Sequence, residues 1–182
     1  MDKNQTGEEF RQLTAFARVD GALMGLMWIV SFACFVGEFS EPMLGVASMA
    51  IGVASIIVGT VRLGKFRDNV LGGVITFGKA VLYSMLTYFY AATLMAVAQY
   101  VYFQFIDNGY LMNQYVSALS MPEYVSMLKD MYGMEAKELI TVLQTTMADM
   151  RPIEVAFQFL TLNLILGIFV SLPVGLVTKR NH

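Results

Sequence analysis

Long apolar runs separated by short polar segments are the main pattern of the chain. The longest uncharged run extends from Ala80 to Ile106, and Asp107-Asn108-Gly109 ends it. A helix of about 20 apolar residues crosses a bilayer core of roughly 30 Å. By this measure the sequence predicts four membrane-spanning helices, at about residues 19–37, 43–61, 80–102 and 155–177. We therefore expect an all-α integral membrane protein, with residues 1–182 forming a single membrane domain built on a four-helix bundle.

Polar residues at the ends of the first two predicted spans fit this pattern. Asp20 lies at the entrance of the first span, where water is still near. Pro42 follows an acidic turn and favours the start of the second span, because proline is common at the first position of a helix. A basic loop, residues 62–67, follows the second span.

The segment that leads into the third span is too long to belong to one crossing. A single helix from Val70 to Ile106 would be roughly 55 Å long at about 1.5 Å per residue. We expect a break near Gly78, so that residues 65–79 form an inner interfacial segment and a hinge. The charged residues and glycines of this hinge are Arg67, Asp68, Gly72, Gly73, Gly78 and Lys79. Lys79 would extend its ammonium group to the lipid headgroups.

Residues 107–151 form a long polar segment that contains two amphipathic patterns. Ser120 and Glu123 have the spacing of a capping box, which predicts a helix start near Met121-Pro122. Apolar residues then recur with the period of a helix, over residues 121–132 and again over 139–150. We expect an extra-cytoplasmic helical pair that either lies on the membrane surface or covers the bundle.

Basic residues predict the orientation. Nine of the twelve lysines and arginines fall in the N-terminal segment, in residues 62–69, at Lys79 or at the C-terminal end. Because basic residues are retained on the cytoplasmic side, both termini are expected in the cytoplasm. The outer segment, residues 107–151, would then lie on the opposite side of the membrane.

Small residues recur at regular intervals in the predicted spans. In lipid, helices associate by the close approach of small residues and by interhelical hydrogen bonds, since burial of apolar surface gives no advantage there. The small residues expected to pack the helices are Gly21, Gly25, Gly45, Gly52, Gly59, Gly167, Ser171 and Gly175. Packing within one chain is the simpler interpretation, and a homodimer through one of these stripes is the alternative.

Three side-chain amides lie within the predicted spans, at Gln99, Gln158 and Asn163. Such residues face other helices and hydrogen-bond to them; the alternative is that they line a polar path. Charged residues fall at the ends of the spans, which weakens the case for a proton-coupled transporter or an ion pump. A passive pore made by several copies stays open as an interpretation.

The residue types that carry most enzyme chemistry are scarce. Cys34 and His182 are the single cysteine and histidine, so the sequence excludes an internal disulfide, a histidine-based triad and a multi-histidine metal site. Ala80 follows Lys79 where a phosphate-binding loop would need serine or threonine. No basic cluster indicates nucleic-acid binding. We expect no catalytic, cofactor-binding or metal-binding residues, and no enzymatic activity.

Methionine is abundant in the outer segment, which holds seven of the fourteen: Met112, Met121, Met127, Met131, Met134, Met147 and Met150. Thioethers bind copper(I), so copper handling is one interpretation. Most of these methionines instead occupy the apolar stripe of a helix. We expect them to pack or to contact a peptide, because methionine-rich faces adapt to different partners.

Several segments resemble the domain of unknown function 4199 family, which consists of small bacterial inner-membrane proteins. The resemblance rests on Lys65-Phe66-Arg67-Asp68, on residues 71–80, on Phe105-Ile106-Asp107, on Tyr132-Gly133-Met134 and on the last span. It implies four spans and a location in the bacterial cytoplasmic membrane. It implies no reaction and no catalytic residues.

Together these features favour a non-enzymatic membrane protein that binds a protein partner or itself. The hinge and the outer segment, 110–150, would be its recognition surfaces, and no cofactor or nucleic acid is expected. The alternative is a small solute or ion transporter or channel that acts as an oligomer, with the amides at Gln99, Gln158 and Asn163 lining its path.

Overall fold

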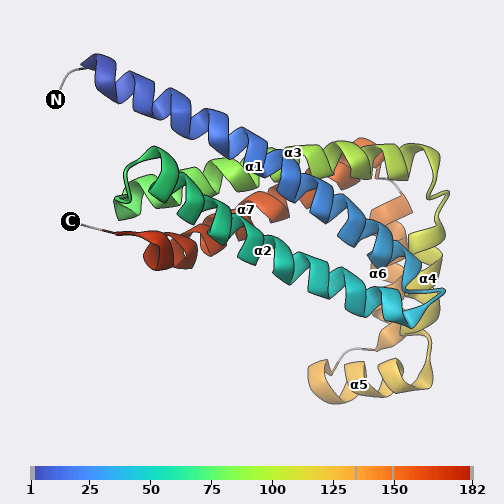
Figure 1. The fold of residues 1–182 in the computed structure, drawn as a ribbon. Helices are drawn as coiled ribbons and strands as arrows, with labels where there is room; N and C mark the ends of the chain where they lie inside the picture. The colour runs from blue at the N-terminus through green and yellow to red at the C-terminus, as the bar shows by residue number, and fades with distance from the viewer. Residues whose placement is uncertain (1–2, 134, 149, 181–182) are drawn as a thin grey trace. The chain divides into compact units, whose positions relative to one another are not determined.

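Seven α-helices account for most of the described chain. The computed structural model describes residues 3–133, 135–148 and 150–180, so that Met134 and His182, on which sequence predictions fell, lie outside the described residues. The helices are α1 (Lys3–Gly37), α2 (Pro42–Val70), α3 (Phe77–Phe105), α4 (Tyr110–Leu119), α5 (Pro122–Tyr132), α6 (Ala136–Ala148) and α7 (Pro152–Thr178) (Figure 1).

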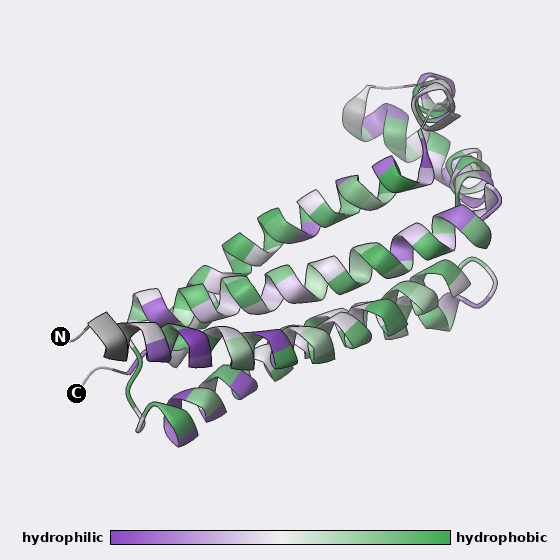
Figure 2. Ribbon diagram, turned by 90° about the horizontal axis from the view of Figure 1, so that it is seen from above, coloured by the Kyte–Doolittle hydropathy of each residue, from purple (hydrophilic) through white to green (hydrophobic). Residues whose placement is uncertain are grey.

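Four of these helices, α1, α2, α3 and α7, are long and apolar enough to cross a membrane. Hydrophobic residues predominate along them (Figure 2), and many large apolar side chains point outward, such as Met49 and Phe169 with 75% and 66% of their surface exposed. Apolar surface on this scale requires lipid as the surrounding solvent. The predicted all-α class with four membrane-length helices is confirmed: the chain is a multi-pass membrane protein.

The chain folds as two compact units. The first unit is Met1–Ala98 together with Gln158–His182, and it holds α1, α2 and most of α3 and α7. The second unit is Gln99–Phe157, and it holds α4, α5 and α6.

Two of the long helices extend well beyond the lengths expected from hydropathy. Helix α1 begins at Lys3 instead of near residue 19, because the inner face of its polar first half packs into the first unit, with Leu13 only 5% exposed. Helix α2 continues to Val70, so the expected basic loop at residues 62–67 is wrong. Leu63 and Phe66 are buried on this extension, and their packing stabilises it.

The connection between α2 and α3 is short and bent. Gly72 and Gly73 have φ angles of 70° and 90°, a left-handed backbone that glycine adopts without steric strain. Ile75 is buried and exchanges two backbone hydrogen bonds with Arg180, with N–O distances of 3.1 and 3.0 Å. Because α3 already begins at Phe77, the non-helical segment is shorter than the expected interfacial segment, 65–79.

An apolar core lies where the inner parts of α1, α2, α3 and α7 meet. Its buried side chains include Leu13, Phe66, Tyr83 and Val174. The Phe66 and Tyr83 rings stack with their centroids 4.8 Å apart. This core packs the first half of α1 against α2, α3 and α7.

Glycines mark the closest approaches between helices of the first unit. A Cβ atom at Gly21 would lie 2.6 Å from Tyr90 Cβ, and one at Gly167 would lie 2.8 Å from Tyr88 Cβ. The other positions in close contact, each with its nearest neighbour, are Gly25 against Leu94, Gly45 against Glu38, Gly59 against Met24 and Gly175 against Val81. Ser171 is fully buried, and its Oγ donates to the Gly167 carbonyl at 2.6 Å.

Gly52 differs from the other glycines of these stripes. Nothing lies within 4 Å of a Cβ placed there. Gly59 follows on the same side of α2, two turns along, and is in contact with Met24. Of these two glycines, Gly59 therefore marks a close contact between α1 and α2, and Gly52 faces open space.

The second unit contains three helices where the sequence predicted two. Helix α4 was not expected; Asp107 stabilises its start by accepting hydrogen bonds from the backbone N–H groups of Gly109 and Leu111 at 3.0 and 3.1 Å. Helix α5 begins at Pro122 as predicted, but Met121 precedes it without a side-chain cap. The capping box at Ser120 is wrong, because the Ser120 hydroxyl donates to the Val116 carbonyl instead.

Alanine at Gly21 should destabilise the protein, because the new methyl group would lie 2.7 Å from the Thr87 carbonyl oxygen. Overpacking of this kind costs about 1–3 kcal/mol. Thermal unfolding of the purified protein in mild detergent measures the loss.

The matched control is Gly52→Ala, which meets open space. It should leave the unfolding temperature unchanged or raise it, since alanine is the better helix former by up to about 1 kcal/mol. Equal losses at the two positions would contradict the packing described here.

Candidate functional site

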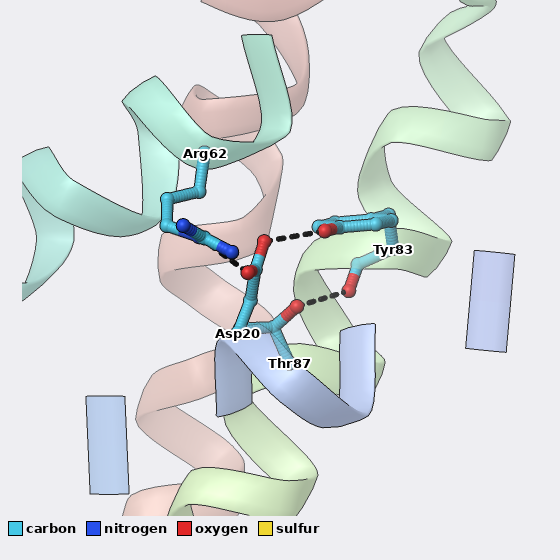
Figure 3. A network of polar contacts seen from close by, with 4 residues as sticks. All are labelled: Asp20, Arg62, Tyr83 and Thr87. Atoms are coloured by element: carbon cyan, nitrogen blue, oxygen red, sulfur yellow. Dashed lines mark hydrogen bonds and ion pairs between the residues drawn. The ribbon is translucent and has the colours of Figure 1, made fainter. Parts of the chain in front are cut away.

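A buried carboxylate joins three helices in the first unit (Figure 3). Asp20 of α1 is 2% exposed; Arg62 of α2 donates from Nε to Asp20 Oδ1, and the Tyr83 hydroxyl of α3 donates to Oδ2. Thr87, one turn along α3, donates from Oγ1 to the Tyr83 carbonyl at 2.9 Å. Both carboxylate oxygens thus have a donor, and the charge of Asp20 is balanced by Arg62.

The sequence placed Asp20 at the entrance of a span, near water, and this expectation is wrong. Helix α1 begins at Lys3, so Asp20 lies in the middle of a continuous helix that packs on both sides of it. The network could have been predicted from the general observation that a charged residue inside a membrane bundle pairs with a residue of opposite charge. Arg62 is the basic residue at the matching end of the next span.

The hinge residues are attached to the end of α7. The Arg67 guanidinium donates from Nη1 to the Thr178 carbonyl at 2.8 Å, and from Nε and Nη2 to the two oxygens of Asp68 at 2.7 and 2.9 Å. Lys79 forms an ion pair with Glu9 of α1 at 2.6 Å. At Gly78 a Cβ atom would meet nothing within 4 Å.

A second feature of the first unit is an open crevice of about 340 Å³, lined by residues of α1, α2, α3 and α7. Its apolar lining consists of the rings and thioether of Trp28, Phe32, Phe35, Phe159 and Met95. Its polar lining consists of Ser31, Ser48 and Asn163. None of these lining residues is ionisable.

Two of the polar lining groups are hydrogen-bonded. Ser31 Oγ donates to the Ser48 carbonyl at 2.9 Å and lies 3.1 Å from Ser48 Oγ. Deeper between α1 and α2, Trp28 Nε1 donates to Ser55 Oγ at 2.9 Å. The α1–α2 wall of the crevice is therefore fixed by hydrogen bonds between the two helices.

Asn163 is the polar lining group without a partner: within the described residues, nothing hydrogen-bonds to its side chain. Gln158 also belongs to α7 in the first unit but does not line the crevice. Gln99 belongs to the second unit, is 2% exposed, and its Oε1 lacks a hydrogen bond to any described residue. Of the three amides, Asn163 is the one that opens on a cavity.

The helices pack tightly next to the buried Asp20 network, where Tyr83 and Thr87 line a small void. The void between Met24, Gly59, Tyr88 and Val174 has a volume of only about 10 Å³. A cavity needs about that much volume to hold one water molecule.

Metal binding finds no support in the arrangement of ligand types. Among the described residues, no three His, Cys, Asp or Glu side chains group closely enough to hold a metal ion. Arg62 and Tyr83 occupy both oxygens of the buried Asp20 carboxylate.

These features define the class as a multi-pass membrane protein with a polar connection among three helices and a recess between four. The chain belongs to the family described as protein of unknown function (DUF4199), whose model matches residues 20–180. This match confirms the family resemblance noted in the sequence. Neither the curated proteins nor the solved structures contain a match to the chain.

Replacing Arg62 by methionine should destabilise the protein strongly. The substitution leaves the Asp20 carboxylate buried, with the Tyr83 hydroxyl as its remaining donor. Removing one partner of a buried ion pair costs about 3–5 kcal/mol, and we expect the lower end because the Arg62 side chain is 39% exposed. Thermal unfolding in detergent is the measurement.

Two further variants identify the cause. Asp20→Asn added to Arg62→Met should recover most of the loss, since no unpaired charge remains. Lys79→Met breaks an ion pair whose side chains are 43% and 44% exposed, and it should cost less than about 1 kcal/mol. A double variant as unstable as Arg62→Met alone would refute this account.

Proposed function

We propose that the protein is a non-enzymatic component of the bacterial inner membrane that binds a protein partner through helix α5. The partner is a second copy of the chain or another membrane protein. Both termini lie in the cytoplasm, and α5 lies on the opposite side of the membrane.

The observation that carries the proposal is the uncovered apolar face of α5. Met121, Tyr124, Met127 and Met131 are 50%, 43%, 43% and 66% exposed, although all four lie on the apolar side of this amphipathic helix. Among residues 122–131 of α5, Val125 and Leu128 are half-buried and the others are exposed. The second unit therefore covers one part of the apolar stripe and leaves the other open.

The chemistry of this face fits a protein better than an anionic lipid surface. Tyrosine and methionine are enriched at protein interfaces, and flexible thioethers adapt to a partner's shape. Interfacial helices that bind lipid are rich in lysine and arginine on their polar side. The polar side of α5 instead carries Glu123 and Asp130 against one base, Lys129, which is paired with Glu135 at 3.1 Å.

Transport is the alternative function, and one observation weighs against it for a single copy. In the layer of Met24, Gly59, Tyr88 and Val174, one residue from each of the four long helices, the void is only about 10 Å³. A path through one copy would need that layer to open.

A photo-crosslinking phenylalanine analogue in place of Met127 should capture the partner in native membranes. Its adduct would have twice the mass of the chain for a second copy, or a single other defined mass for another protein. The matched control carries the same analogue at Val142 of α6, which is 59% exposed but lies off this face.

The proposal further requires that Met131→Asp reduce the yield of the Met127 adduct several-fold, because it places a charge in the face. Crosslinks to lipid alone, or equal yields from Met127 and Val142, would refute partner binding through α5.

Cysteine labelling tests the orientation. In a Cys34→Ser background, Asp130→Cys should react in intact cells with a maleimide that cannot cross membranes. Lys65→Cys should react only after the membrane is opened, because the basic residues of the hinge are retained in the cytoplasm. The reverse pattern would overturn the orientation and leave the fold untouched.

A further inference from the structure

We propose that the crevice of the first unit binds an uncharged amphipathic lipid whose polar group is a hydroxyl or an amide. The site is independent of the α5 face, which belongs to the second unit. Its distinguishing group is the unpaired Asn163 side chain.

The Asn163 side chain lacks hydrogen bonds that a bound ligand would supply. It lies eleven residues after the first residue of α7 and fifteen before the last, near the middle of a membrane-length helix. Its carboxamide offers two N–H donors and one acceptor oxygen. Leaving such a group without hydrogen bonds in an apolar medium is costly. A ligand that both accepts and donates a hydrogen bond would satisfy it.

Ser48 supplies a second polar contact on the opposite wall. The Ser31 hydroxyl donates to the Ser48 carbonyl at 2.9 Å and also lies 3.1 Å from Ser48 Oγ, a contact in which either hydroxyl can be the donor. The lone pairs of Ser48 Oγ remain open to a donor from the ligand. Asn163 and Ser48 are thus the two anchors, one on α7 and one on α2.

The remainder of the lining sets the ligand's charge and body. No ionisable side chain lines the crevice, so a carboxylate, phosphate or ammonium would enter without a counter-charge. Aromatic walls such as Trp28 and Phe159 favour an apolar chain lying against them. The volume of about 340 Å³ lies in the range of small-molecule sites, roughly 300–1,000 Å³.

The lipid phase is the source of the ligand. The crevice is open, and the elements that bound it are helices of membrane length. Gly52 of α2, four residues from Ser48 of the lining, also faces open space, since nothing lies within 4 Å of a Cβ there. A lipid can enter from the side without crossing the packed inner layer.

Trp28 gives a direct measurement, because it is the single tryptophan of the chain. The full-length protein in nanodiscs of phosphatidylcholine is titrated with a monoacylglycerol brominated on its chain, and Trp28 fluorescence is recorded. We expect saturable quenching. The fatty acid with the same brominated chain should quench far less at neutral pH, because its carboxylate has no counter-charge in the crevice.

Asn163→Leu keeps the size of the side chain and removes the amide, and it should weaken binding about tenfold, the value of one good hydrogen bond. Its unfolding temperature should not fall, since no described residue depends on the amide. Leu162→Ala, on the exposed side of α7, is the control and should bind as the unchanged protein does.

Three results would overturn the proposal. Quenching that fails to saturate, or that brominated phosphatidylcholine reproduces, would mean that bulk lipid fills the crevice. Unchanged affinity in Asn163→Leu would remove the amide from the site. A fall in the unfolding temperature of Asn163→Leu would assign the amide a purely structural role. Partner capture at α5 is unaffected by any of these results.

Discussion

Helices in lipid gain nothing by hiding apolar surface from one another, and this constraint governs the first unit. Their association must come from close packing and from polar contacts. Polar contacts and close packing occur side by side in α1. Asp20 binds Arg62 and Tyr83. The next residue, Gly21, lies close to Thr87 and Tyr90. A misplaced helix would leave the Asp20 charge unpaired in an apolar interior, so the network specifies how α1, α2 and α3 pack.

The end of the first unit that carries the hinge is held by polar contacts. Arg67 binds the Thr178 carbonyl, Ile75 and Arg180 exchange backbone hydrogen bonds, and Lys79 pairs with Glu9. These contacts join residues distant in sequence. The crevice lies elsewhere in the same unit, and Asn163 in its lining is without a partner among the described residues.

The second unit differs from the first in the length and polarity of its helices. Its helices are short and amphipathic, and the unit covers only part of the apolar stripe of α5. Asp107 organises its entry by capping α4 and accepting a hydrogen bond from the Tyr102 hydroxyl at 2.9 Å. The uncovered apolar face of α5 is the surface through which we propose that a protein partner binds. The family description records no activity, so this surface and the crevice are the features from which function can be argued.

Hydropathy alone determined the membrane class and the number of long helices, because apolar run length acts locally along the chain. The start of α5 near Pro122 was predicted from a capping box that the structure does not contain, since the Ser120 hydroxyl donates to the Val116 carbonyl. Local signals did not determine the ends of α1 and α2, which extend because Leu13, Leu63 and Phe66 pack against distant residues. Small-residue spacing identified Gly21 and Gly52 alike, yet one touches α3 and the other faces open space. From the sequence, Asp20 was placed at the end of a span, but the tertiary structure makes it the residue that joins three helices. Asn163 was interpreted as a residue that packs helices together, but its side chain lies unpaired in the lining of the crevice. The reason is that a side chain's partners come from other helices, whose separation and rotation no local pattern encodes.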